Sequence, residues 1–235
     1  MLFPASIAAR LPLATYSIAL LVHVQRLTGS YAAAGLVAGA LAVAQGTGAP
    51  LLGRLVDRRG QTVVLLGSAL IGGAALATIA ALPAGTPLPV LILLAAVIGL
   101  ATPPVGACLR TLIPVLVPGA ERQRRAYAVD ATATELTWVA GPPLALTVGA
   151  VLGTGAALTA AGAVLISATA LFALSPASRS WRPAAGTGTR RGSALASPAM
   201  RTLVLVLVGV GVVFGATEVG VTAAADHAAG LLLGL

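Results

Sequence analysis

Unbroken apolar segments of about twenty residues dominate the chain and limit the folds that it can adopt. A helix needs about 20 apolar residues to cross roughly 30 Å of hydrocarbon. Only 9% of the 235 residues are charged and the mean hydropathy is +1.00, whereas soluble domains carry about 25% charged residues. We therefore predict an all-α polytopic membrane protein.

Seven segments reach this length, at about 3–24, 31–53, 62–82, 88–109, 129–150, 154–174 and 202–223. The first is too long for a cleavable signal peptide and contains Arg10, so we expect it to be retained. A short apolar run, 228–235, follows Asp226 and His227. Eight helical residues span only about 12 Å, so we interpret this run as a truncated eighth helix and the sequence as a fragment of a longer chain.

The arginines alternate between the connections in a way that predicts orientation. Twelve of the fourteen would lie on one side of the membrane, and an excess of arginine marks the cytoplasmic side. We therefore expect a multi-pass protein of the cell (inner or plasma) membrane with a cytoplasmic N-terminus. The twelve are Arg54, Arg58, Arg59, Arg110, Arg122, Arg124, Arg125, Arg179, Arg182, Arg190, Arg191 and Arg201.

Composition also predicts three regions. Residues 1–174 form a six-helix bundle, 175–201 a basic linker, and 202–235 the truncated start of a second bundle. The segment 175–198 mixes Pro, Gly, Ser, Thr and Arg without periodicity, which is typical of a flexible linker. Contact of its arginines with anionic lipid headgroups is the alternative interpretation.

The nine residues GRLVDRRGQ, 53–61, concentrate charge between the second and third segments. Gly53 and Gly60 permit a tight reversal, and Asp57 is expected near the N-terminus of the third helix, where the helix dipole favours an anion. An anchoring turn would explain the arginines alone, but it would not explain the aspartate and the two glycines.

This pattern resembles the signature between the second and third helices of the major facilitator superfamily. The matching positions are Gly53, Leu55, Asp57, Arg58, Arg59 and Gly60, while Val56 and Gln61 depart from it mildly. The resemblance implies an N-terminal six-helix bundle built from two inverted three-helix repeats. It further implies alternating access between two bundles, with the charged turn acting in gating.

Gly/Pro clusters occur in both the second and the fifth segment, which correspond in such a repeat. They are GTGAP at 46–50 and AGPP at 140–143, and we expect helix breaks at Pro50, Gly141 and Pro142. Gly141–Pro142, with Gly149, is similar to the signature of drug–proton antiporters, although Ala133 and Thr137 replace its upstream glycines. A simple packing kink is the alternative, and the Gly35/Gly39 and Gly149/Gly153 spacings are those of close helix packing.

Proton-coupled members of the family usually carry an arginine four residues before a glycine of the fourth helix. If Gly99 is that glycine, Ala95 occupies the arginine's position, and Arg110 follows much later. We therefore hypothesise that Arg110 instead pairs with Asp57 across the ends of neighbouring helices. This would make Arg110 part of the gating motif.

Acids within apolar segments are costly and suggest function. The candidates for substrate or proton binding are Glu135, Asp130 and Glu218, with a structural hydrogen bond as the alternative for Glu135 and an interfacial position for Asp130. Arg10 is expected to extend to the membrane interface. His23 and His227 are expected to be interface residues.

Several function classes are disfavoured. Cys108 is the only cysteine and no cluster has metal-ligand spacing, so no metal site or cofactor is predicted. No nucleophile–base pair suggests an enzyme, and with 3% aromatic residues a nucleic-acid partner is not expected.

We predict a secondary transporter that exports small, hydrophobic compounds, with the proton as candidate coupling ion. The partners would be membrane lipid, the small-molecule substrate, and a missing C-terminal half or second chain. The alternative is a non-transporting membrane fragment or scaffold.

Overall fold

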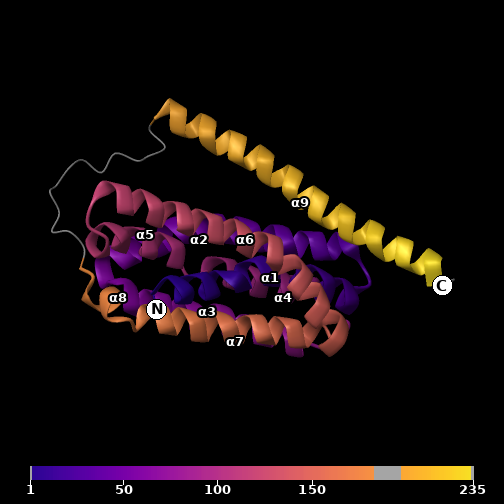
Figure 1. Cartoon of the computed structure of the whole chain (residues 1–235). Coiled ribbons are helices and arrows are strands. Elements are labelled where there is room, and N and C mark those ends of the chain that lie inside the picture. Colours follow the sequence, from indigo (N-terminus) through magenta and orange to yellow (C-terminus); the bar gives the residue numbers. More distant parts are fainter. Residues whose placement is uncertain (1, 183–196, 234–235) are drawn as a thin grey trace. The chain divides into compact units, whose positions relative to one another are not determined.

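The chain forms two units, Met1–Pro183 and Ala184–Leu235, and the computed structural model describes residues 2–182 and 197–233. The first unit is a bundle of antiparallel helices (Figure 1). The described residues of the second form one helix. The helices are α1 (Leu2–Thr28), α2 (Tyr31–Arg59), α3 (Gln61–Ala81), α4 (Leu88–Leu100), α5 (Val105–Leu116), α6 (Ala120–Leu152), α7 (Thr154–Ala173), α8 (Pro176–Ser180) and α9 (Pro198–Leu233).

Seven helical stretches of the described residues are long and apolar enough to cross a membrane, with α4 and α5 together forming the fourth. The prediction of an all-α polytopic membrane protein is thereby confirmed. The separate eighth helix is not found, because the α9 backbone runs without interruption to Leu233. The sequence around Ala223–His227 contains neither Gly nor Pro, and its alanines are the strongest helix formers.

Single glycines join consecutive helices at two corresponding places. Gly60 lies between α2 and α3 with φ 86° and ψ 164°, and Gly153 lies between α6 and α7 with φ 90° and ψ 152°. This backbone region is open almost exclusively to glycine. The two joints have nearly the same conformation, as expected for repeated three-helix units.

The helix contacts follow the same internal repeat. Helix α1, the first span of the first repeat, packs against α6 and α7 of the second repeat. Helix α4, the first span of the second repeat, packs against α2 and α3 of the first repeat. Helices α3 and α7, the last spans of the two repeats, pack against each other. Exchanging the first three spans with the second three turns one set of contacts into the other. The two inverted repeats implied by the sequence resemblance are therefore visible as packing.

The expected breaks at Pro50, Gly141 and Pro142 are wrong, since α2 and α6 are continuous across them. Gly48 and Gly141 instead allow close helix approach. A β-carbon added at Gly48 would lie 2.7 Å from the carbonyl oxygen of Leu100, and one at Gly141 would lie 2.5 Å from the β-carbon of Ala14. Gly39, expected to pack closely, has no such neighbour within 4 Å.

The fourth span contains the break that the sequence analysis did not predict. Helix α4 ends at Leu100 and α5 begins at Val105, after Pro103 and Pro104. Proline lacks the N–H that continues a helical hydrogen-bond ladder. The Oγ1 atom of Thr102, the residue just before the prolines, lies 3.3 Å from the hydroxyl oxygen of Tyr16 on α1. This contact connects the break to α1.

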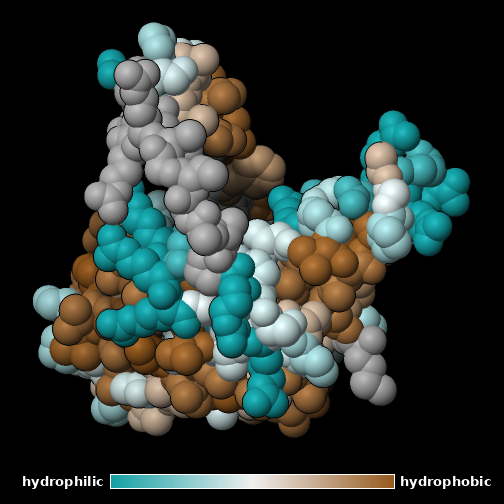
Figure 2. Space-filling view, turned by 90° about the vertical axis from the view of Figure 1, so that its left-hand side faces the viewer, coloured by the Kyte–Doolittle hydropathy of each residue, from teal (hydrophilic) through white to brown (hydrophobic). Residues whose placement is uncertain are grey.

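We call the end of the bundle that carries the Gly60 joint, the α5–α6 connection and α8 the basic end. The N-terminus lies at this end as well (Figure 1). The expected loop between the fourth and fifth spans is largely helical, because α6 already begins at Ala120 and carries Arg122, Arg124 and Arg125. Viewed from this end, hydrophilic residues gather across the face, with hydrophobic surface around them (Figure 2).

Candidate functional site

A buried aspartate on α6 is the centre of the principal polar cluster in the bundle. Asp130 has no exposed side-chain surface. It shares one face of α6 with Thr134, Thr137 and Gly141, at helical spacings of four, three and four residues. Gly141 brings this face close to α1, so the local sequence of α6 turns Asp130 toward the neighbouring helix.

Arg10 on α1 provides the first partner of this aspartate. Its Nη2 donates to Asp130 Oδ1 and, at 3.0 Å, to Ser6 Oγ, while its Nη1 donates to Thr134 Oγ1 at 2.7 Å. Its Nε donates to the Ser6 carbonyl oxygen at 3.2 Å. Only 12% of the Arg10 side chain is exposed. The guanidinium is therefore held inside the bundle by both helices.

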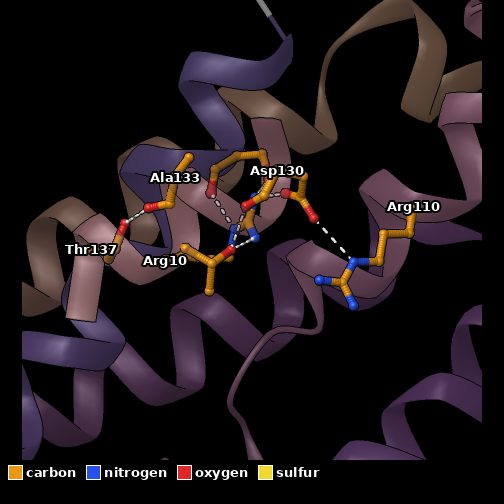
Figure 3. A network of polar contacts seen from close by, with 7 residues as sticks. Arg10, Arg110, Asp130, Ala133 and Thr137 are labelled. Carbon is orange, nitrogen blue, oxygen red and sulfur yellow. Dashed lines mark hydrogen bonds and ion pairs between the residues drawn. The ribbon is translucent and has the colours of Figure 1, made fainter. Parts of the chain in front are cut away.

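Arg110 on α5 provides the second partner, from the other side of the carboxylate (Figure 3). Its Nε donates to Asp130 Oδ2 at 3.0 Å, and 57% of its side chain is exposed. Arg110 lies on the short helix α5, after the break at Pro103–Pro104. The direction of α5 therefore determines where the Arg110 side chain lies. One carboxylate thus connects three spans: the first, the fourth and the fifth.

The cluster changes three of the sequence-based interpretations. Arg110 pairs with Asp130, so the hypothesised Arg110–Asp57 pair is wrong. Arg10 is an ion-pair partner inside the bundle instead of a residue that extends to the interface, and Asp130 is buried instead of interfacial. An arginine and an aspartate inside apolar segments were the available signal, but sequence spacing does not reveal a pairing between residues 120 positions apart.

The residues of the charged motif divide between helix and joint. Gly53, Leu55, Asp57, Arg58 and Arg59 belong to the end of α2, and Gly60 forms the joint. Asp57 therefore lies in the last turn of α2 and not within the third helix. It is exposed and makes no hydrogen bond or ion pair with another described residue.

Gln61, the last residue of the motif, is buried and connects three elements. Its Nε2 donates to Thr111 Oγ1 on α5 at 3.0 Å, and its Oε1 accepts from Ser178 Oγ on α8 at 3.1 Å. The motif thus fastens α8 to the basic end of the bundle. The sequence analysis treated Gln61 only as a mild departure from the motif.

Glu135 has a different environment from Asp130, although both are on α6. It is exposed and makes no hydrogen bond or ion pair with the described residues. Its neighbours Leu136, Trp138 and Val139 are also exposed, by 63%, 50% and 72%. The Glu218 side chain, like those of Asp226 and His227, lies outside what the structure describes.

His23 is buried at the opposite end of the bundle. Its Nδ1 lies 2.9 Å from Thr154 Oγ1 and its Nε2 lies 3.2 Å from the carbonyl oxygen of Ile79. These contacts link α1, α3 and α7. In the described part of the chain, no three His, Cys, Asp or Glu side chains come together as potential metal ligands.

Comparison with known proteins supplies the family. The family model of the Major Facilitator Superfamily matches residues 2–233. Neither a curated protein nor a solved structure matches the chain. Proteins of this superfamily are membrane transporters of small molecules and not enzymes. With seven helical stretches in its described part that are suited to membrane spans, and a match over nearly its whole length, this chain belongs to the major facilitator superfamily.

Proposed function

We propose that this bundle belongs to a proton-coupled transporter that exports small hydrophobic compounds by alternating access. The observation that carries the proposal is Glu135, an unpaired carboxylate on the outward face of a membrane-spanning helix. It lies ten residues beyond Arg125 on α6, about 15 Å along the helix axis. An unpaired acid that faces lipid at this depth is costly, so we expect this face of α6 to border a water-filled cavity.

The surroundings of Glu135 support a hydrophobic substrate. Leu136, Trp138 and Val139 expose apolar surface beside the carboxylate, and neighbouring polar side chains are too few to bind a sugar. A carboxylate beside apolar and aromatic groups suits a lipophilic cation. Exchange of such a substrate for a proton at Glu135 would couple export to the proton gradient.

One bundle provides only one wall of such a cavity. Glu135 lies on the outer surface of the six-span bundle, so a second bundle must cover it. We propose that a complementary half, from a longer chain or a second chain, supplies the other wall. Asp57, which has no partner among the described residues of its own bundle, is then available to contact that second bundle in one conformation of the transport cycle.

Membrane vesicles that contain the protein together with its complementary half test this function. We expect an imposed proton gradient to drive accumulation of ethidium, a lipophilic cation. Glu135→Gln should reduce the initial rate about tenfold or more, because an amide cannot carry the proton. Glu121→Gln is the matched control, since Glu121 is an exposed acid of the same helix that pairs with Arg124 and Arg125.

Two outcomes would count against the proposal. Equal proton dependence of the wild type and Glu135→Gln would remove Glu135 from the coupling mechanism. The absence of gradient-driven transport for a broad panel of hydrophobic compounds would favour a non-transporting membrane scaffold instead.

A further inference from the structure

A basic cleft lies between the α2–α3 joint and α8. It has a volume of about 340 Å³, and its lining includes Arg58 and Arg59 from α2 and Arg179 and Arg182 from the α8 region, together with Trp181. No acid is among its lining residues. Four guanidinium groups gathered in this way repel one another, and a bound anion relieves that repulsion.

The contacts of the arginines leave most of this charge uncompensated. Arg182 donates only to the carbonyl oxygens of Arg179 and Trp181, at 2.9 and 3.0 Å. Arg58, Arg59 and Arg179 form no ion pair with any described residue. The same end carries arginines that do have partners, since Arg124 and Arg125 both pair with Glu121.

The cleft is built by specific contacts and is not an accident of two flexible arms. Ser178 on α8 is buried and donates to Gln61 at the start of α3. Thr62 donates to the carbonyl oxygen of Ala173 at 3.1 Å. Trp181 packs against the apolar core of the basic end. These contacts hold α8 against the joint and so set the width of the cleft.

An apolar groove continues from this cleft along the side of the bundle. It has a volume of about 420 Å³ between α2, α3 and α4, and it shares Arg59 and Val63 with the cleft. On α3 it extends to Ile71. From Gln61 to Ile71 is ten residues, about 15 Å of helix, which equals the hydrocarbon depth of one leaflet of a 30 Å core.

We infer that the cleft binds the phosphate of an anionic phospholipid, such as phosphatidylglycerol, and that the groove holds one of its acyl chains. Charge complementarity argues for the headgroup, because basic pockets beside membrane-spanning helices suit anionic lipids. The shared lining residues and the matching depth argue for the chain. Trp181 in the lining of the cleft is in keeping with the preference of tryptophan for the membrane interface.

The internal repeat provides a comparison within the molecule. The corresponding groove between α1, α6 and α7 has a volume of about 170 Å³ and is lined by residues that include Leu11, Pro12 and Val164. Its lining contains no arginine. Each repeat therefore has an apolar groove at the corresponding place, and only the groove between α2, α3 and α4 continues into a basic cleft beside α8.

Tryptophan fluorescence tests this inference on the purified whole chain, which has only two tryptophans. In a Trp138→Phe background, Trp181 reports on the cleft, and lipids brominated near the headgroup quench it on contact. Each basic residue contributes about fivefold to binding of an anionic surface. We therefore expect phosphatidylglycerol to quench at a mole fraction at least about tenfold lower than phosphatidylcholine does.

Arg58→Gln combined with Arg179→Gln should abolish this preference. Arg122→Gln combined with Arg124→Gln removes the same charge from the same end, outside the cleft, and should preserve it. If both double variants lost the preference for phosphatidylglycerol equally, net charge alone would explain it, and the inference would be overturned. Equal quenching by the two lipids in the starting protein would also overturn it.

Two further arms test the source of the phosphate and the role of the groove. Inorganic phosphate at millimolar concentration should not relieve the quenching; if it does, the site binds soluble phosphate and not a lipid. Gly67 lines the groove, and a β-carbon there would meet nothing within 4 Å. Gly67→Leu should therefore fold and weaken binding of long-chain but not of dihexanoyl phosphatidylglycerol. Unchanged long-chain binding would contradict the assignment of the groove.

Discussion

Asp130 shows how one residue can organise several spans. Its carboxylate is fully buried and receives a guanidinium on each oxygen, from Arg10 and Arg110. A buried charge is tolerated when its partners and hydrogen bonds are complete, and removing one partner leaves an uncompensated charge in a low dielectric. The two arginines are not equivalent, because Arg10 is nearly buried and Arg110 is more than half exposed.

Asp130→Asn should lower the free energy of unfolding by about 3–5 kcal/mol, since it leaves Arg10 buried without a counter-charge. Unfolding of the purified protein in detergent, followed by circular dichroism, measures the change. Glu121→Gln, which removes only exposed ion pairs, should cost less than about 1 kcal/mol.

An apolar replacement of the pair separates charge from packing. Arg10→Met combined with Asp130→Leu should recover most of the stability lost in Asp130→Asn, because both buried charges are then absent. If Asp130→Asn is no more destabilising than Glu121→Gln, the cluster does not stabilise the bundle.

At the residue level, the sequence drew attention to the acids inside the helices but did not reveal the partners of Asp130. Asp130 and Glu135 were identified because acids are conspicuous in apolar segments. Their different environments, one buried and one exposed, depend on how α6 is rotated about its axis. That rotation follows from packing at Gly141, which the sequence suggested only as a break.

At the scale of elements, glycines at helix crossings control how closely the repeats pack. At the crossing of α2 and α4, each helix contributes a glycine. Gly48 on α2 lies close to the backbone of Leu100. Gly99 on α4 lies close to the backbone of Leu41 and Gln45. A backbone atom cannot rotate away from an added methyl group. The two crossings at Gly48 and Gly141 occupy corresponding places in the repeat.

Gly48→Ala should therefore destabilise the protein by about 1–3 kcal/mol through overpacking. Gly39→Ala, in the same helix, should leave stability unchanged or raise it by up to about 1 kcal/mol, because alanine favours helix and meets no neighbour there. Thermal unfolding of both variants checks the pair. If the two variants were equally stable, α2 and α4 could move apart at Gly48 without a measurable cost.

The Pro103–Pro104 break determines the direction of α5 and hence the reach of Arg110. Replacing both prolines by alanine should let α4 continue into α5 and turn Arg110 away. The coupling energy between Arg110 and Asp130, measured by a double-mutant cycle, should then fall from about 1 kcal/mol to nearly zero. The cycle between Arg10 and Asp130 should be unaffected, and a loss of both couplings would mean general disruption.

At the scale of the whole molecule, the distribution of arginine predicts the orientation of the bundle. The α3–α4 connection, Leu82–Pro87, and the start of α6 lie at opposite ends. Arginine-rich ends are retained in the cytoplasm. The basic end, with α8 and the lipid cleft, should therefore face the cytoplasm.

Cysteine labelling in a Cys108→Ser background tests this orientation. An impermeant maleimide should label Ala84→Cys in intact cells and Arg122→Cys only after permeabilisation. The reverse pattern would invert the bundle and place the proposed gating motif outside.

Local sequence was sufficient to predict the spans, the Gly60 joint and the charge asymmetry, because hydrophobic length, glycine backbone freedom and arginine content act within short stretches. Packing between distant segments set the partners of Asp130, the continuity of α2 and α6, and the seating of α8 on Gln61. The Arg10–Asp130 and Gln61–Ser178 contacts depend on how helices rotate and cross over separations of more than a hundred residues. Steric fit at a few glycines and prolines selects one such arrangement, and that fit exists only when the helices are assembled.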